Sequence, residues 1–175
     1  MDYLLRNRLK RKKRILTVCT GNICRSPTAE AVLRKKFTEA GLDEGQIEIE
    51  SAGTQAISFV GASPDSDAIA AAARRQYSLM GMQARQFDLQ DFNDYDYILA
   101  MDKENFQRIS YLKPTNPRAE LRLFMSFIPA LSSTDVPDPY RRKTAAFEKA
   151  LDLIEMGAGA FVEAIKEKQG ITGVR

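Results

Sequence analysis

The sequence has no histidine among its 175 residues. Histidine is the side chain that most often serves as a general base near neutral pH, so its absence excludes every Ser–His or Cys–His catalytic pair. A nucleophile in this chain must be activated by backbone N–H groups and by cationic side chains instead. We expect a general acid, if the chain has one, to be a carboxyl group.

Cysteine is almost as scarce, because Cys19 and Cys24 are the only two in the chain. Both belong to one short segment, which excludes a framework of disulfides and favours a reducing, cytoplasmic location. A C-x4-C spacing without histidine supplies at most half of the ligands of a structural zinc site. We therefore expect no metal and no other cofactor.

Long apolar runs are missing as well. No stretch approaches the roughly 20 residues of a membrane-spanning helix, so no membrane span is predicted. Residues 1–14 are rich in Lys and Arg, but no apolar run follows them, so they do not have the pattern of a secretory signal. A chain of 175 residues with 44% apolar and 28% charged residues is typical of one globular domain.

The net charge of +3 is distributed unevenly along the chain. Residues 1–14 carry seven basic side chains against Asp2, which leaves the remaining residues with a net charge near −3. We predict a basic N-terminal tail over residues 1–13 and one domain over residues 14–170. The simplest interpretation of the tail is a solvated terminus; the alternative is contact with an acidic partner such as nucleic acid or anionic lipid.

The stretch from Arg14 to Glu30 carries the chemistry of the chain. Residues 15–18 form a short apolar run typical of a buried strand, and residues 19–25 follow as a loop. Ser26 is a candidate N-cap and Pro27 a candidate first residue of the next helix. A loop between a buried strand and a helix N-terminus directs backbone N–H groups into one concavity, which binds anions. Gly21 and Asn22 are suited to positive φ in this loop.

Two side chains turn this anion cradle into a candidate reaction centre. Cys19 stands at the end of the strand, where the loop N–H groups and Arg25 favour its thiolate form. Arg25 is always charged, and its planar guanidinium can hold two oxygens of a tetrahedral oxyanion. The loop thus supplies a nucleophile and an oxyanion clamp.

The remainder of the chain alternates between helical and strand patterns. Helices are predicted over residues 28–40, 66–79, 103–109 and 144–168, and further strands over residues 47–50 and 121–124. Strands that alternate with helices predict an α/β fold, in which a parallel sheet is covered on both faces and the site lies at the carboxyl ends of the strands. Asp102 is a candidate N-cap of the third helix.

The string C-T-G-N-I-C-R-S-P at residues 19–27 closely resembles the phosphate-binding loop of the low-molecular-weight protein tyrosine phosphatases. Shorter matches to the same family follow it: S-A-G-T at 51–54, A-R-Q at 84–86, a third strand at 96–102, and D-P at 138–139, just before the last helix. The resemblance covers about residues 14–168. It implies a single α/β domain with a four-stranded parallel sheet and helices on both faces, the phosphotyrosine phosphatase I-like fold.

The resemblance also implies a role for each site residue. Cys19 would attack phosphorus, Arg25 would hold the phosphoryl oxygens, and Asp138 would act as the general acid. The phosphate-binding loop would consist of Thr20, Gly21, Asn22, Ile23, Cys24 and Arg25. Supporting roles would fall to Ser26 as a donor to the Cys19 sulfur, to Asp102 beside the loop, and to Tyr140 and Phe59 along the cleft. The substrate would be a phosphorylated protein or peptide, hydrolysed through a cysteinyl-phosphate without a metal.

The chain departs from the family pattern on both walls of the cleft. Phe59 is displaced by one position from the aromatic residue of many bacterial relatives, so it could stack on a substrate ring or pack internally. Arg141 and Arg142 stand where a second aromatic residue or a glycine is more usual. Cys24, which shares its loop with Cys19, could form a reversible disulfide with it or be a small residue of the loop wall.

Three alternative functions remain open. In related protein arginine phosphatases the position of Ile23 is typically Thr, so Ile23 favours phosphotyrosine over phosphoarginine. Arsenate reductases that share this loop use additional cysteines elsewhere, and this chain has none. An inert scaffold with a nucleic-acid-binding tail would be expected to have a damaged site, whereas Cys19, Arg25 and Asp138 are all present.

Overall fold

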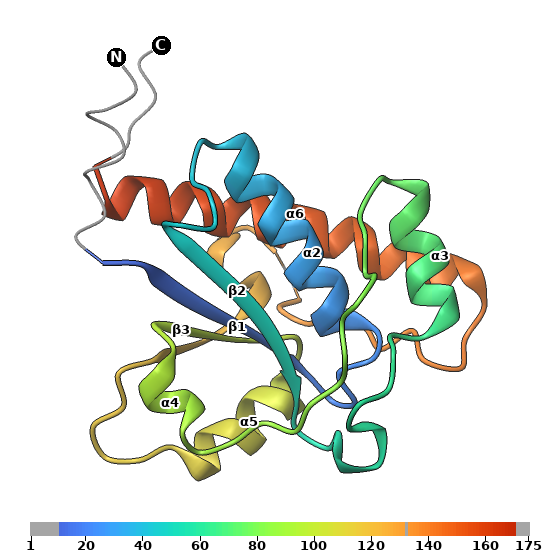
Figure 1. The fold of residues 1–175 in the computed structure, drawn as a ribbon, viewed down its shortest axis with the longest axis horizontal. Helices are drawn as coiled ribbons and strands as arrows, with labels where there is room; N and C mark the ends of the chain where they lie inside the picture. Colours follow the sequence, from blue (N-terminus) through green and yellow to red (C-terminus); the bar gives the residue numbers. More distant parts are fainter. Residues whose placement is uncertain (1–10, 132, 171–175) are drawn as a thin grey trace.

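A four-stranded parallel sheet forms the centre of the molecule in the computed structural model, which describes residues 11–131 and 133–170 (Figure 1). The strands lie in the order β2-β1-β3-β4, and every neighbouring pair is parallel. Their bounds are β1 Lys13–Cys19, β2 Ile47–Gly53, β3 Tyr97–Ala100 and β4 Glu120–Leu123. This confirms the predicted fold class.

Helices cover both faces of the sheet (Figure 1). On one face lie α2 (Arg25–Glu39), α3 (Ser66–Arg74) and α6 (Thr144–Lys168), and on the other lie α4 (Asp91–Asp94) and α5 (Lys103–Leu112). Two 3-10 turns complete the elements, η1 at Ile57–Phe59 and η2 at Phe124–Phe127. No helix in the described ranges is long and apolar enough to cross a membrane.

The strand residues divide the core into two parts. Successive side chains of a strand point to opposite faces, so Ile15 and Leu99 join the core under α2 and α6, while Leu16, Val18 and Ile98 join the core under α4 and α5. All five side chains are fully buried. Strands that are buried on both faces need continuous apolar sequence, and this explains the run from Ile15 to Val18.

The register brings the carboxyl ends of three strands to one edge of the sheet. Cys19 pairs with Gly53 of β2, and Val18 pairs with Ala100 of β3. Backbone hydrogen bonds extend this contact into the loops, because the Thr54 N–H donates to the Cys19 carbonyl at 2.8 Å. The segments that follow β1, β2 and β3 therefore meet where the sequence predicted a site.

Three helix boundaries differ from the prediction by three residues or more, and one of them is the end of α5, which lies at Leu112 and not at residue 109. Helix α3 ends at Arg74 and not at residue 79, because Gln76 has a left-handed φ of 61° that cannot continue a helix. Helix α2 begins at Arg25, so Ser26 is inside the helix and not its N-cap. The N-cap position belongs to Cys24, which makes no side-chain capping bond.

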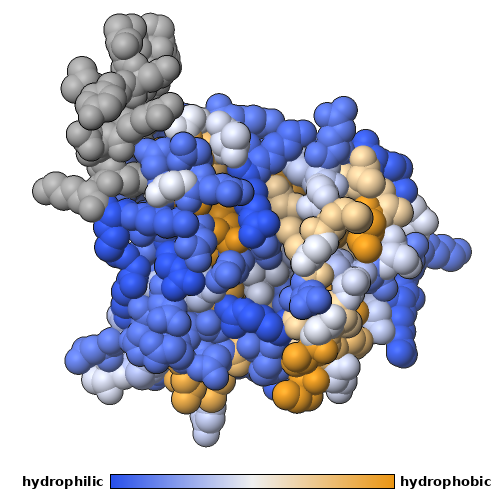
Figure 2. All heavy atoms as spheres, viewed as in Figure 1, coloured by the Kyte–Doolittle hydropathy of each residue, from blue (hydrophilic) through white to orange (hydrophobic). Residues whose placement is uncertain are grey.

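The surface seen in Figure 2 is covered mostly by hydrophilic side chains, with smaller apolar areas between them. The last basic residues of the predicted tail lie within the described part of the chain. Arg11 and Lys13 form ion pairs with Asp96, and Lys12 pairs with Glu48 at 3.0 Å. Residues 1–10, which hold the remainder of the predicted tail, lie outside the described residues. The division into tail and domain stays a prediction.

Candidate active site

The loop between β1 and α2 is shaped by a buried asparagine. Asn22 has a left-handed φ of 56° and is 2% exposed. Its side-chain oxygen accepts from the Arg85 N–H at 2.9 Å, and its nitrogen donates to the Ser26 hydroxyl at 2.9 Å. Asparagine tolerates this backbone conformation better than most residues, and the two hydrogen bonds hold it there.

Glycines serve the loop by leaving space. Gly21 does not take the positive φ that the sequence suggested for it; a Cβ atom there would lie 3.3 Å from the Phe59 ring, so its lack of a side chain admits Phe59 to the wall. Gly53 at the end of β2 is more restrictive. A Cβ atom there would lie 2.6 Å from the Thr20 carbonyl oxygen and 2.9 Å from the Asn22 nitrogen. The S-A-G-T segment therefore needs its glycine for the loop to pack against β2.

Cys19 lies at the floor of the site with a hydroxyl beside its sulfur. The Ser26 Oγ is 3.1 Å from the Cys19 Sγ and 3.2 Å from the Ala52 carbonyl oxygen. Because Oγ already accepts from Asn22, its single hydrogen is available to one of these two atoms. A thiolate is the stronger acceptor, so ionisation of Cys19 favours donation to the sulfur. Ser26 serves this sulfur instead of capping the helix.

Arg25 is buried, with 2% of its side chain exposed, and most of its donors are occupied. One terminal nitrogen, Nη1, donates to Asp102 and to the Val136 carbonyl, the latter at 2.9 Å. The other, Nη2, donates to the Thr20 hydroxyl at 3.2 Å and lies 3.2 Å from an oxygen of Asp138. Among the buried polar side-chain atoms of the described residues, only Arg25 Nε has no hydrogen-bond partner.

A closed ring of hydrogen bonds fixes the orientation of this guanidinium. With its amide oriented so that each atom meets a complementary partner, Asn105 accepts from the Thr20 hydroxyl at 3.1 Å and donates to both Asp102 oxygens, at 3.0 and 3.2 Å. Thr20 and Asp102 in turn each contact Arg25. Asn105 is 1% exposed and was not among the predicted site residues. Nothing in its local sequence distinguishes it, because its contact with Thr20 spans 85 positions.

Asp102 combines two functions in the structure. Its carboxylate accepts from the Asn105 N–H at 2.7 Å, which confirms the predicted N-cap of α5. The same carboxylate forms an ion pair with Arg25. The N-terminus of α5 therefore fixes the Asp102 carboxylate, and this carboxylate in turn fixes Arg25.

The pKa values of two loop residues follow from their surroundings. Burial alone would lower the pKa of Arg25, but the negative charges of Cys19, Asp138 and Asp102 more than offset it, so the pKa is raised and the guanidinium stays charged. The pKa of the Cys24 thiol is also raised, chiefly by burial and further by Asp65, Cys19 and Asp138. Cys24 is therefore a neutral thiol near pH 7.

These groups surround a pocket of about 250 Å³. Its floor is Cys19 and the loop, and the Phe59 and Tyr140 rings form its walls, almost perpendicular to each other with centroids 6.2 Å apart. Asp138 lies at the mouth with 48% of its side chain exposed. The complete lining consists of Cys19, Thr20, Gly21, Ile23, Cys24, Arg25, Gln55, Phe59, Asp138 and Tyr140. Of the predicted site residues, only Asn22, Ser26 and Asp102 are absent from this lining. Ser26 contacts Cys19 and Asp102 contacts Arg25, and Asn22 bonds to Ser26.

A family model described as low molecular weight phosphotyrosine protein phosphatase matches residues 14–170. The chain belongs to this family. YfkJ of Bacillus subtilis, a low molecular weight protein-tyrosine-phosphatase, is 38% identical over 156 residues, which are 89% of this chain and 97% of that protein. Wzb of Escherichia coli K12, named likewise, is 37% identical over 155 residues, with the same coverage.

Solved structures agree with these sequence matches. The crystal structure of YfkJ from Bacillus subtilis superposes with a TM-score of 0.83 at 35% identity, over 90% of this chain and 97% of that one. The structure of Vibrio vulnificus Wzb in complex with benzylphosphonate has a TM-score of 0.76 at 33% identity, over 88% of this chain and 99% of that one.

Arg141, at one of the positions where the sequence predicted a departure from the family pattern, lies beside a pocket wall. Arg141 has a left-handed φ of 58°, and its guanidinium lies over the Tyr140 ring, 5.2 Å from the centroid. The Arg141 guanidinium thus covers one face of the Tyr140 ring. No group of three or more potential metal ligands occurs within the described ranges, so no site for a metal ion can be identified there.

Proposed function

We propose that this protein hydrolyses phosphotyrosine in proteins or peptides through a cysteinyl-phosphate formed on Cys19. The observation that carries the proposal is the buried, unpartnered Nε of Arg25 in the described structure, next to a second nitrogen whose partner Asp138 is half exposed. Two adjacent guanidinium donors match two oxygens of a phosphoryl group, and an unsatisfied buried donor costs about 1–3 kcal/mol until such an acceptor arrives.

In the first step the Cys19 thiolate attacks phosphorus in line with the leaving oxygen. The S–P bond forms, the P–O bond to the tyrosine breaks, and the tyrosine oxygen takes a proton from Asp138. The loop N–H groups and Arg25 hold the three equatorial oxygens as charge develops on them. Phosphate replaces Asp138 at Nη2 of Arg25, and this exchange frees the carboxyl group to meet the leaving oxygen.

In the second step water attacks the cysteinyl-phosphate. Asp138, now ionised, accepts a proton from the water, the S–P bond breaks, and inorganic phosphate and the Cys19 thiolate are released. The Ser26 hydroxyl stabilises the departing thiolate because it lies 3.1 Å from the sulfur. Thr20, Asn105 and Asp102 are positioning residues, because their ring of hydrogen bonds keeps Arg25 oriented in both steps.

The pocket walls favour an aromatic phosphomonoester. The Phe59 and Tyr140 rings meet edge to face and line the pocket with aromatic surface against which a phenyl ring can pack, and Phe59 contacts the loop through Gly21. The Vibrio vulnificus relative was solved with benzylphosphonate, which has the same combination of a phenyl ring and a tetrahedral oxyanion. Ile23 in the lining adds an apolar surface where protein arginine phosphatases typically have Thr.

The test compares purified protein on matched peptides that carry phosphotyrosine, phosphoarginine or phosphoserine. We expect phosphotyrosine to be hydrolysed with the highest kcat/KM and Cys19→Ser to remove turnover. The Ser variant keeps the loop donors and Arg25, so we expect it to fold. Circular dichroism verifies this. Preference for phosphoarginine would transfer the assignment to the arginine phosphatases. Turnover by Cys19→Ser close to that of wild type would remove Cys19 from the mechanism.

We also propose a cytoplasmic location, since both cysteines are free thiols and the nucleophile requires a reducing environment. The physiological partner is a phosphorylated protein. The basic residues 1–10 are available in this proposal for an acidic partner. A variant without residues 1–10 tests this point, because it should keep its activity on peptides and lose only binding to such a partner.

A further inference from the structure

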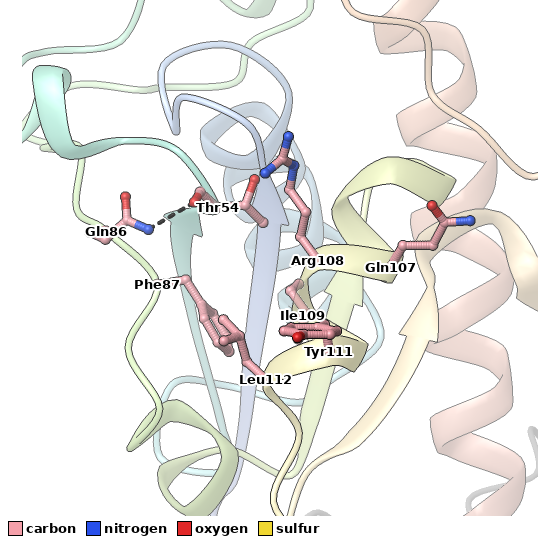
Figure 3. A pocket seen from close by; sticks show the side chains of 8 residues that line it. All are labelled: Thr54, Gln86, Phe87, Gln107, Arg108, Ile109, Tyr111 and Leu112. Atoms are coloured by element: carbon pink, nitrogen blue, oxygen red, sulfur yellow. Dashed lines mark hydrogen bonds between the residues drawn. The ribbon is translucent and has the colours of Figure 1, made fainter.

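The structure has a second cavity, of about 450 Å³, and Figure 3 shows the side chains that line it. It is formed between α5, Thr54 directly after β2 and the segment at Gln86 and Phe87 that precedes α4, on the face of the sheet opposite α2 and α6. Its lining is Thr54, Gln86, Phe87, Gln107, Arg108, Ile109, Tyr111 and Leu112, none of which has a part in the chemistry above. We refer to this cavity as the α5 groove.

The α5 groove has an apolar base and a polar upper end. Phe87 and Ile109 are buried at its base, whereas Leu112 is 49% exposed and Tyr111 92% exposed at its rim. Figure 3 shows Leu112 next to the Phe87 ring, and Tyr111 below Ile109. Exposed large apolar side chains around a concave surface mark binding sites more often than scattered ones do.

The polar end of the groove adjoins the catalytic pocket. Thr54 lines the groove, and the next residue, Gln55, lines the pocket. In the amide orientation that satisfies both groups, the Gln55 oxygen accepts from the two terminal nitrogens of Arg108, at 3.0 and 3.1 Å. Two exposed polar side chains, Gln55 and Arg108, therefore form a ridge between the two cavities.

We propose that the α5 groove binds an apolar side chain of the phosphoprotein substrate, within a few residues of the phosphotyrosine. This inference rests on the proposed function. A phosphotyrosine in the catalytic pocket brings its own main chain to the mouth, where Gln55 and Arg108 offer hydrogen bonds to peptide groups. An extended chain advances by about 3.3 Å per residue, so a segment that crosses this ridge delivers a nearby side chain into the groove.

Charge at the ridge favours an apolar and not an acidic occupant. Arg108 already pairs with Glu104 on the same helix at 3.1 Å, so its charge is largely balanced. The base of the groove offers Phe87 and Ile109 and no free cation. Burial of a Leu, Ile, Met or Phe side chain against these residues is favourable by the hydrophobic effect. Specificity for the protein substrate would thus come from a second contact outside the catalytic pocket.

The test uses paired phosphotyrosine peptides that differ only by Leu or Ser at one position, scanned over the four positions on each side of the phosphotyrosine. For wild type we expect at least one position where Leu raises kcat/KM about tenfold. In Leu112→Asp this ratio should fall close to one. Met156→Asp is the matched control, because Met156 is also 49% exposed and lies on α6, outside the lining of both cavities. It should keep the wild-type ratio.

Each ratio compares two peptides on one preparation, so partial loss of folded enzyme does not change it. Equal rates on Leu and Ser peptides at every position would overturn the groove and leave the phosphatase assignment intact. A ratio that survives in Leu112→Asp would also overturn it, since the preference would then arise elsewhere. If wild type hydrolysed no phosphotyrosine peptide, the proposed function would fail and the groove with it.

Discussion

Arg25 and Asp138 are in contact but have very different environments, because Arg25 is 2% exposed and Asp138 is 48% exposed. A buried guanidinium in a ring of hydrogen bonds keeps one position. At the mouth, one Asp138 oxygen faces Arg25 and the other accepts from the Tyr140 N–H at 3.1 Å, so the oxygen that Arg25 releases can turn to the leaving group. The two prolines that flank Asp138 restrict its backbone, so this movement belongs to the side chain.

Asp138→Asn should lower kcat on aryl phosphates by about 10²–10⁴, the usual range for general acid catalysis. The loss should shrink for leaving groups that depart easily, since they need less protonation. The alkaline limb of the kcat/KM profile should flatten, because the first step no longer needs a protonated carboxyl group. A variant with the same leaving-group dependence and the same alkaline limb as wild type would assign the acid to another residue, with Asp102 the nearest candidate.

The raised pKa of Cys24 predicts how the site responds to peroxide. Peroxide converts the Cys19 thiolate to a sulfenic acid, and attack by the Cys24 thiolate on its sulfur then forms a disulfide and releases hydroxide. Well below its pKa, the thiolate fraction of Cys24 rises about tenfold per pH unit. Mass spectrometry of the loop peptide should therefore find more disulfide, and less sulfinic acid, at about pH 9 than at about pH 7.

Cys24→Ser is the control, because it cannot form this disulfide at either pH and should accumulate the irreversible sulfinic form. Equal disulfide fractions at both pH values would contradict the mechanism.

The candidate reactive residues could be identified from the sequence, and so could Ser26 and Asp102 beside them, whereas Asn105 and Gln55 could not. The Cys19–Pro27 string and the D-P pair lie in short segments, so a local pattern contains them. Asn105 and Gln55 act through contacts with residues of other segments. A contact between distant positions leaves no mark on the sequence around either partner.

Helix α6 shows how an element is fitted to its neighbours. It was predicted over residues 144–168, and the structure confirms both ends. Gly157 on its buried side faces η2, and a Cβ atom there would lie 2.6 Å from the Phe124 ring and 2.8 Å from the Met125 sulfur. Two positions along, a Cβ on Gly159 would have no neighbour within 4 Å. The helical pattern predicts the element, but not which glycine is sterically required.

Alanine at these two positions should have opposite effects. Alanine favours the helix by about 1 kcal/mol over glycine, so Gly159→Ala should raise the melting temperature. In Gly157→Ala the collision with Phe124 and Met125 should dominate and cost about 1–3 kcal/mol. Differential scanning calorimetry of both variants measures the difference. If the two changed stability in the same direction, the close approach of α6 to η2 would be wrong.

Across the whole molecule, ion pairs join elements that are distant in sequence. Lys12 bonds to Glu48 and lowers its pKa, which links the start of β1 to β2. Arg74 and Arg75, at the end of α3, bond to Glu148 of α6 and lower its pKa as well. The alternating strands and helices predicted the layers of this fold, but these pairings depend on the packed arrangement and could not be predicted from the sequence.

These two glutamates predict a loss of stability in acid. Each has a folded-state pKa below the unfolded value of about 4.5, so its contribution is present above about pH 4.5 and is lost as the pH falls through the folded pKa. The melting temperature should therefore fall in this range, less steeply at high salt, since both carboxylates are solvent-accessible. Glu48→Gln combined with Glu148→Gln should flatten this part of the profile. An unchanged slope would mean that other carboxylates dominate.

The vacant Nε of Arg25 also has a consequence for regulation by the reaction's own product. Inorganic phosphate carries the same oxygens as the substrate's phosphoryl group and needs no phenyl ring to reach the guanidinium. The free enzyme therefore binds the phosphate that it releases, and each turnover ends with this inhibitor bound in the catalytic pocket. Phosphate should inhibit competitively. It should also raise the melting temperature, because binding adds to the free energy of unfolding an amount that grows with the logarithm of the phosphate concentration once this exceeds the dissociation constant. In a cell rich in phosphate, the rate would then be set by how well the rest of the substrate competes.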